Sequence, residues 1–209
     1  MLHVKYRPSS WSEVVGQDKA VSSLRALRFG GNAVWLQGQS GTGKTTLAYL
    51  YAAEHCQHAC VEEYDAGELT PALIREIERR LAIRGFGDGC RAVIVNEAHG
   101  LRKDAIRALL VALERIPSPA CWLFTTTCDG ADSLFEEQID GSPLLSRCIP
   151  VALARRDLAQ AFAERARYVA QSEGLDGRPV ADYMRLAKDC RNNLRMMLSR
   201  IEAGAMRVE

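Results

Sequence analysis

A glycine-rich octapeptide reads Gly38-Gln39-Ser40-Gly41-Thr42-Gly43-Lys44-Thr45 and fits the pattern G-x-x-x-x-G-K-[ST] in full. It follows an apolar run at 33–37 and opens a predicted helix at 44–55. Glycines let backbone N–H groups turn inward on phosphate groups, and the helix directs its positive N-terminal end at them. We therefore predict a phosphate-binding loop, in which Lys44 neutralises the β- and γ-phosphates of a nucleotide and the Thr45 hydroxyl ligates Mg²⁺. Thr46, the next residue, is included in the predicted nucleotide contacts.

Strands and helices alternate on both sides of this loop. The segments predicted as strands are 33–37, 61–64, 91–99 and 121–127. The segments predicted as helices are 17–29, 44–55, 70–83 and 103–115. This alternation indicates an α/β fold with a doubly wound parallel sheet, whose ligands bind at the carboxyl ends of the strands.

The pattern changes near residue 155, after which only helical periodicity remains. Helices are predicted at 156–173, 180–189 and 192–203, with a turn between Gly174 and Pro179. We therefore expect two domains. An α/β nucleotide-binding domain spans 1–153, and a small three-helix domain spans 154–209.

The strand at 91–99 ends in the polar pair Asn96-Glu97. Where a phosphate loop is present, a later strand commonly ends in an aspartate that supports Mg²⁺, followed by a glutamate that activates water. Glu97 is placed as the general base, but Asn96 stands where the aspartate is expected and brings no negative charge to the metal site. We expect weakened Mg²⁺ affinity, which Asn96→Asp would raise, and hydrolysis that is either slow or lost. The alternatives are a core strand with a polar cap and, for the nearby His99, an ordinary surface histidine.

Composition excludes several classes of protein. The 209 residues include 27 Lys and Arg against 26 Asp and Glu, for a net charge of +1. No global positive field therefore indicates nucleic-acid binding, so any DNA contact is local or shared with partner subunits. Neither a signal peptide nor an apolar window long enough to span a membrane is evident, and we expect a cytoplasmic protein without membrane partners.

Seven cysteines without a framework spacing indicate reduced thiols rather than disulfides. Four candidate zinc ligands, His55, Cys56, His58 and Cys60, lie close together in the sequence. Their spacing matches no common zinc site, and we do not assign a metal there.

The N-terminal stretch from Val4 to Gln17, VKYRPSSWSEVVGQ, resembles the K-Y-R-P…V-x-G-Q start of clamp-loader ATPase subunits, the bacterial gamma/tau and eukaryotic replication factor C type. The resemblance implies a P-loop AAA+ fold with the three C-terminal helices as a lid. It also implies an arm that lies across the adenine. The implied base-pocket residues are Tyr6, Arg7, Pro8, Val15 and Gly16. A surface strap is the alternative role for this arm.

Three further motifs extend the resemblance to about Ile201. Ser146-Arg147-Cys148 is similar to the S-R-C motif whose arginine reaches a neighbouring subunit's γ-phosphate, which makes Arg147 a catalytic candidate acting in trans. Thr127, or alternatively Thr126, occupies the place of the polar sensor at the end of its strand.

The third motif lies in the last predicted helix. Asn193-Leu194-Arg195-Met196-Met197-Leu198 is similar to the lid sensor G-x-[LA]-R-x-x-L, which makes Arg195 a nucleotide contact. Asn192 replaces the glycine of that pattern.

The chain also departs from the family pattern. It lacks the four-cysteine insertion of bacterial gamma/tau subunits. The resemblance also places residue 209 at the end of the lid, so we expect the helical collar through which the family forms pentamers to be missing. The connection from Cys128 to Pro143 is long and acidic, and its acidic residues are Asp129, Asp132, Glu136, Glu137 and Asp140.

The resemblance implies a function in DNA replication. ATP and Mg²⁺ bound between AAA+ subunits would couple the assembly to a sliding clamp and primer-template DNA. One alternative is a nucleotide-sensing module with weak or no hydrolysis, as Asn96 suggests. Another is an AAA+ protein of recombination, transposition or phage biology that loads no clamp.

Overall fold

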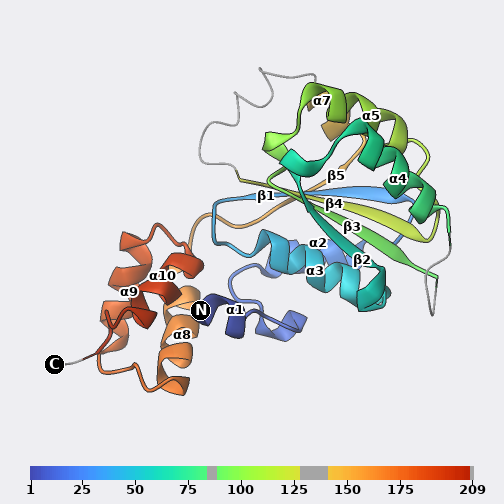
Figure 1. Ribbon diagram of the computed structural model, residues 1–209. Coiled ribbons are helices and arrows are strands. Elements are labelled where there is room, and N and C mark those ends of the chain that lie inside the picture. The colour runs from blue at the N-terminus through green and yellow to red at the C-terminus, as the bar shows by residue number, and fades with distance from the viewer. Residues whose placement is uncertain (84–88, 128–140, 208–209) are drawn as a thin grey trace.

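The computed structural model describes residues 1–83, 89–127 and 141–207, and its centre is a five-stranded parallel sheet (Figure 1). The strands are β1 (Asn32–Gly38), β2 (Val61–Asp65), β3 (Arg91–Asn96), β4 (Ala120–Thr127) and β5 (Ile149–Ala152). Their order across the sheet is β2-β3-β4-β1-β5. Because β4 lies between β1 and β3 and the strands are parallel, the phosphate loop, Asn96 and the end of β4 lie together at the carboxyl ends of the strands.

Helices cover both faces of the sheet, so the predicted doubly wound α/β fold is confirmed. In Figure 1, α2 (Asp18–Ala26) and α3 (Lys44–His55) lie on one face, and α4 (Pro71–Leu81) and α5 (Lys103–Leu113) lie on the other. Alternation along β1 supplies both cores, because Val34 and Leu36 pack with the first pair of helices and Trp35 packs with the second.

Local chemistry sets several element boundaries. Helix α4 begins where the Thr70 hydroxyl accepts a hydrogen bond from the Leu73 amide at 3.2 Å, with Pro71 in the first turn. The predicted helix at 17–29 ends earlier, at Ala26, because Leu27 is extended. The remaining short elements are α1 (Leu2–Lys5), α7 (Gly141–Leu145) and the 3-10 turns η1 (Trp11–Glu13), η2 (His58–Cys60), η3 (Ala66–Glu68) and η4 (Ala98–Gly100).

Strand β5 was not predicted from the sequence. It has four residues, includes Pro150, and pairs in parallel with β1 at the edge of the sheet. Proline has no backbone N–H and is therefore tolerated in an edge strand. Because proline is otherwise rare in strands, Pro150 made this segment difficult to predict as a strand from the sequence.

The three predicted C-terminal helices are present as α8 (Ala159–Ser172), α9 (Val180–Asp189) and α10 (Leu194–Glu202), and they share a core of their own. Leu2 is buried in that core, and α1 lies beside the bundle in Figure 1. The N-terminal arm therefore packs partly with the three-helix unit, and the division of the chain at 153/154 stays a prediction.

Asn192 and Asn193 shape the start of α10. Asn192 has a φ of +57°, a left-handed conformation that asparagine tolerates better than most residues, and so it can stand where the pattern has glycine. The Asn193 side chain accepts a hydrogen bond from the Met196 amide at 3.0 Å and caps the helix.

Among the described residues, no helix is long and apolar enough to cross a membrane.

Candidate nucleotide site

The phosphate loop connects β1 to α3, as predicted, and its conformation depends on two glycines. Gly41 and Gly43 have φ values of +72° and +101°, which residues with a side chain rarely adopt. The Lys44 ammonium is nearly buried and donates hydrogen bonds to the carbonyl oxygens of Gly38 and Gln39, each at 3.0 Å. Thr42 adds a hydroxyl bond to the Gln39 carbonyl at 2.8 Å. The loop is thus wrapped around a lysine cation at the N-terminus of a helix, an arrangement that suits phosphate binding.

The start of α10 rests directly on this loop. The Leu194 amide donates to the Gly41 carbonyl at 3.3 Å. A Cβ atom on Gly41 would lie 1.9 Å from the Asn193 Oδ1 atom, so only glycine fits at position 41. The lid therefore touches the phosphate loop within the same chain, and Arg195 comes next to it.

Asn96, at the end of β3, is held by three hydrogen bonds. Its Oδ1 atom accepts from the hydroxyls of Thr45 at 2.9 Å and Thr125 at 3.0 Å. Its Nδ2 atom donates to the Glu63 carboxylate at 2.6 Å. The two residues predicted to support Mg²⁺, Thr45 and Asn96, are therefore in direct contact, whereas Thr125 and Glu63 were not singled out in the sequence.

Glu97 follows in a left-handed conformation with φ +50° and ψ +48°, an uncommon state for glutamate that is frequent at functional sites. The Thr127 hydroxyl donates to its carboxylate at 3.0 Å, and His99 Nδ1 lies 3.4 Å from the same oxygen. Thr126, the alternative sensor, is buried and contacts His99 at 3.4 Å. The contact with Glu97 thus favours Thr127 of the two threonines, although its role stays a prediction.

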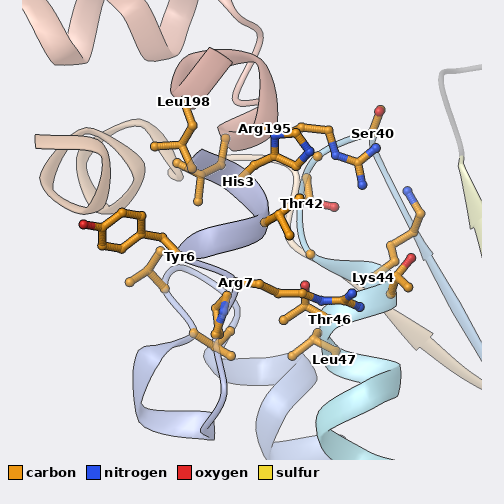
Figure 2. Close-up of a pocket in the computed structure, with 18 of the residues that line it drawn as sticks. His3, Tyr6, Arg7, Ser40, Thr42, Lys44, Thr46, Leu47, Arg195 and Leu198 are labelled. Atoms are coloured by element: carbon orange, nitrogen blue, oxygen red, sulfur yellow. The ribbon is translucent and has the colours of Figure 1, made fainter. Parts of the chain in front are cut away.

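A cavity of about 510 Å³ lies between the phosphate loop, the N-terminal arm, the end of β3 and the lid (Figure 2). Its lining includes these predicted site residues: Tyr6, Arg7, Pro8, Val15, Ser40, Gly41, Thr42, Gly43, Lys44, Thr45, Thr46, Asn96, Glu97 and Arg195. The predicted residues outside the lining are Gly16, Gly38, Gln39, Thr127 and Arg147. Segments from across the chain therefore enclose one space next to the phosphate loop.

The cavity also has lining residues that the sequence analysis missed. His3, Glu63 and Arg165 are three polar examples. His3 and Arg165 come from α1 and α8, and no motif marks them. They line the cavity because the N-terminal arm packs against the lid helices. This is a tertiary contact, which a sequence motif does not reveal.

Contacts of the arm differ from residue to residue. The Tyr6 hydroxyl donates to Glu173 of the lid and points away from the phosphate loop in Figure 2. This hydrogen bond raises the pKa of Tyr6. The Arg7 guanidinium lies 5.3 Å from the centre of the Tyr49 ring, a cation–π distance. Gly16 positions the chain, because a Cβ atom there would lie 2.8 Å from the Leu158 side chain.

Magnesium fits the polar groups at the end of β3. A hydroxyl, an amide oxygen and nearby carboxylates are oxygen ligands of the kind that Mg²⁺ prefers, with phosphate oxygens and water completing the shell. The described residues contain no group of three or more His, Cys, Asp or Glu side chains arranged to hold a metal on their own. These residues therefore suit a metal ion that is also bound by the phosphate groups of a nucleotide. Thr45 and Asn96 would support it.

Arg147 lies away from the cavity lining, between α7 and β5. Its guanidinium contacts the Glu114 carboxylate at 2.6 Å and the Pro143 carbonyl oxygen at 2.8 Å. The acidic positions predicted in the preceding connection, Asp129, Asp132, Glu136, Glu137 and Asp140, fall outside the described residues.

The fold and the cavity together define a P-loop nucleotide-binding protein of the AAA+ class. Thermotoga maritima RuvB structures share this fold. A point variant of RuvB gives a TM-score of 0.72 at 24% identity, covering 94% of this chain and 64% of that one. Another RuvB structure, described as a Holliday junction branch migration motor, gives a TM-score of 0.71 at 24% identity and the same coverage. No protein-family model matches the chain.

The homologues in sequence are clamp-loader AAA+ subunits. Replication factor C small subunit 1 of Pyrobaculum arsenaticum is 30% identical over 85% of this chain and 54% of its own length. The replication factor C small subunit of Methanosarcina acetivorans is 30% identical over 82% and 51%. DNA polymerase III subunit tau of Bacillus subtilis is 29% identical over 60% and 27%. The predicted resemblance is confirmed, and the chain spans about half the length of the replication factor C subunits that it matches.

Proposed function

We propose that this chain is a clamp-loader-like AAA+ ATPase of DNA replication that binds ATP with Mg²⁺ in the cavity around the phosphate loop. One observation carries the proposal. The phosphate loop, the Asn96-Glu97 pair, the arm and Arg195 line a single cavity although they are far apart in the sequence. The replication factor C relatives support the assignment to clamp loading.

Each side chain has a proposed task in that cavity. Lys44 and the loop amides hold the phosphates, and Arg195 contacts them from the lid. Tyr6, Arg7, Pro8 and Val15 enclose the base, with Gly16 fixing the path of the arm.

The reaction itself rests on a second group of residues. Glu97 accepts a proton from the attacking water, and Thr127 holds the Glu97 carboxylate in position through the hydrogen bond at 3.0 Å. Magnesium, when bound, neutralises charge on the phosphate oxygens. Thr45 and Asn96 would hold the ion.

Arg147 is proposed to serve the nucleotide of a neighbouring subunit. Two observations support this: it does not line its own chain's cavity, and Glu114 holds its guanidinium at the surface. The proposed partners are other AAA+ subunits, a sliding clamp and primer-template DNA, and the proposed location is the cytoplasm.

A second candidate is a nucleotide-sensing module with little or no hydrolysis, which the neutral Asn96 favours. An AAA+ protein of recombination, transposition or phage biology would share the cavity but not the clamp.

The decisive experiment measures the mass in solution by analytical ultracentrifugation, with and without ATP and Mg²⁺. We expect a nucleotide-dependent oligomer. A monomer under all conditions would contradict a site shared between subunits.

Two further assays separate the candidates. ATP turnover measured with and without primer-template DNA distinguishes a DNA-stimulated ATPase from a sensor. Capture on an immobilised sliding clamp distinguishes a clamp loader from the recombination class.

A further inference from the structure

The amide of Asn96 can lie in only one orientation. Its Oδ1 atom faces the hydroxyls of Thr45 and Thr125, and its Nδ2 atom faces the Glu63 carboxylate at 2.6 Å. A carboxylate is an acceptor only, so the atom that faces Glu63 has to be the N–H donor. A hydrogen bond to a charged acceptor at this distance is of the stronger kind.

An aspartate at position 96 could not make this contact. Two carboxylate oxygens would face each other without a hydrogen between them, and like charges so close repel strongly. The neutral residue at 96 and the charged residue at 63 are therefore complementary. The negative charge that is missing from β3 is present on the neighbouring strand β2, which pairs with β3 in parallel.

The carboxylate of Glu63 points toward the nucleotide cavity. Glu63 is among the residues that line it. The adjacent Glu62 points to the opposite face of β2 and forms ion pairs with Arg80 at 3.0 Å and Arg91 at 4.0 Å. Asp65, the other acidic residue on the Glu63 face, also lines the cavity and lies opposite Asn96 in the strand register, but its carboxylate caps the turn η3. Of the three acidic side chains, Glu63 is the one linked through Asn96 to the Thr45 hydroxyl of the phosphate loop.

We propose that Glu63 supplies the negative charge of the magnesium site, with Asn96 as a neutral link between Glu63 and Thr45. The inference rests on the proposed nucleotide function and adds a positioning residue to it. Donation to a carboxylate polarises the Asn96 amide, which makes its oxygen a better acceptor for the Thr45 hydroxyl. The account also changes the expectation for Asn96→Asp, which would place a second charge beside Glu63.

The test uses Glu63→Gln, which removes the charge and keeps a carbonyl oxygen that can accept from Asn96. We measure the dissociation constant of a fluorescent ATP analogue in EDTA and in saturating Mg²⁺. The quantity compared between variants is the ratio of the EDTA value to the Mg²⁺ value. A carboxylate beside the site disfavours free ATP and favours ATP with its metal. We expect the ratio to fall about 10-fold in Glu63→Gln, the order of effect of one charge several ångströms from a divalent ion in partly hydrated surroundings.

Two variants serve as controls. Glu62→Gln makes the same change of net charge on the opposite face of β2 and should leave the ratio unchanged. Glu63→Asp keeps the charge and should retain most of the ratio. Thermal melting of each variant checks that the fold is intact.

A charge exchange completes the design. Glu63→Gln combined with Asn96→Asp moves the carboxylate back to β3, and the side-chain amide introduced on β2 can donate to it. We expect the ratio of the double variant to return to within about threefold of the wild-type value. Because neighbouring groups are coupled, Asn96→Asp should raise the ratio more in the Glu63→Gln background than in the wild-type background.

The proposal is overturned if Glu63→Gln keeps the wild-type ratio within about twofold, or if Asn96→Asp gains the same factor in both backgrounds. Failure of the proposed function looks different. In that case the ATP analogue either does not bind or binds equally well to Lys44→Ala.

Discussion

The nucleotide cavity and the surface around Arg147 are built in opposite ways. In the cavity, residues from the arm, the phosphate loop, β3 and the lid converge on one space. Thr127 lies outside the lining but contacts Glu97. Arg147, another catalytic candidate, instead makes its contacts with Glu114 and Pro143 away from that space. The difference supports the proposal that the residues of one chain bind a nucleotide, while Arg147 contacts a phosphate group bound by a neighbouring subunit.

The largest expected effect tests this division directly. Arg147→Ala should lower ATP hydrolysis of the assembled protein by ~10³-fold, because an engaged arginine finger stabilises charge that develops in the transition state. The affinity of an isolated monomer for ATP should stay nearly unchanged. Turnover assays and nucleotide titrations measure the two quantities.

Mixing provides the control for that prediction. The Arg147→Ala variant keeps an intact nucleotide site, and the Lys44→Ala variant keeps an intact Arg147. If both variants still assemble, a mixture of the two should therefore recover part of the ATP hydrolysis. Loss of ATP affinity in a demonstrably monomeric Arg147→Ala sample would mean that the arginine acts in its own subunit.

The next effect concerns the link between the arm and the lid. Leu2 is 6% exposed and packs in the core of the lid helices, so Leu2→Ala should reduce the free energy of unfolding by about 2 kcal/mol. Val4→Ala is the matched control, because Val4 is 61% exposed. Denaturant unfolding compares the two. Equal effects would show that the arm is not anchored through Leu2.

A smaller effect should appear as a pH dependence. Hydrogen bonds from Lys5 and then Tyr6 hold the pKa of Glu173 below its ordinary value of 4.5. A lowered folded-state pKa stabilises the fold above the unfolded-state pKa, and this stabilisation is lost as the pH falls through the lowered value. Glu173→Gln should therefore melt at a lower temperature than wild type at about pH 7, and the difference should shrink below about pH 4. A difference that stays constant from about pH 7 to about pH 3 would contradict the ion-pair explanation.

Much of the fold was predictable because it depends on local patterns. The phosphate loop, its strand and its helix are contiguous, and the alternation of apolar segments indicated both faces of the sheet. Strand β5 escaped because four residues with Pro150 carry too little periodicity, and its place at the sheet edge depends on β1.

The candidate site was predictable only where a motif marks it. Lys44, Thr45, Asn96 and Arg195 belong to motifs, and all four line the cavity. Glu63 also lines the cavity but belongs to no motif. Two adjacent glutamates in VEEYD look alike until the structure places Glu63 on the same face of the sheet as Asn96, with its carboxylate accepting a hydrogen bond from the Asn96 amide. The neutral residue at 96 was the available hint, since a missing charge at a proposed metal site is a reason to look for a carboxylate on the neighbouring strand.

The central claim is that the cavity around the phosphate loop binds ATP through Lys44. Calorimetric titration of ATP with Mg²⁺ into wild type and Lys44→Ala tests it most directly, with Lys103→Ala as a control for loss of an exposed lysine. The account predicts saturable binding to wild type and Lys103→Ala. It predicts at least ~100-fold weaker binding to Lys44→Ala, because a nearly buried cation that neutralises phosphate charge is removed. Unchanged affinity in a folded Lys44→Ala protein would contradict the account.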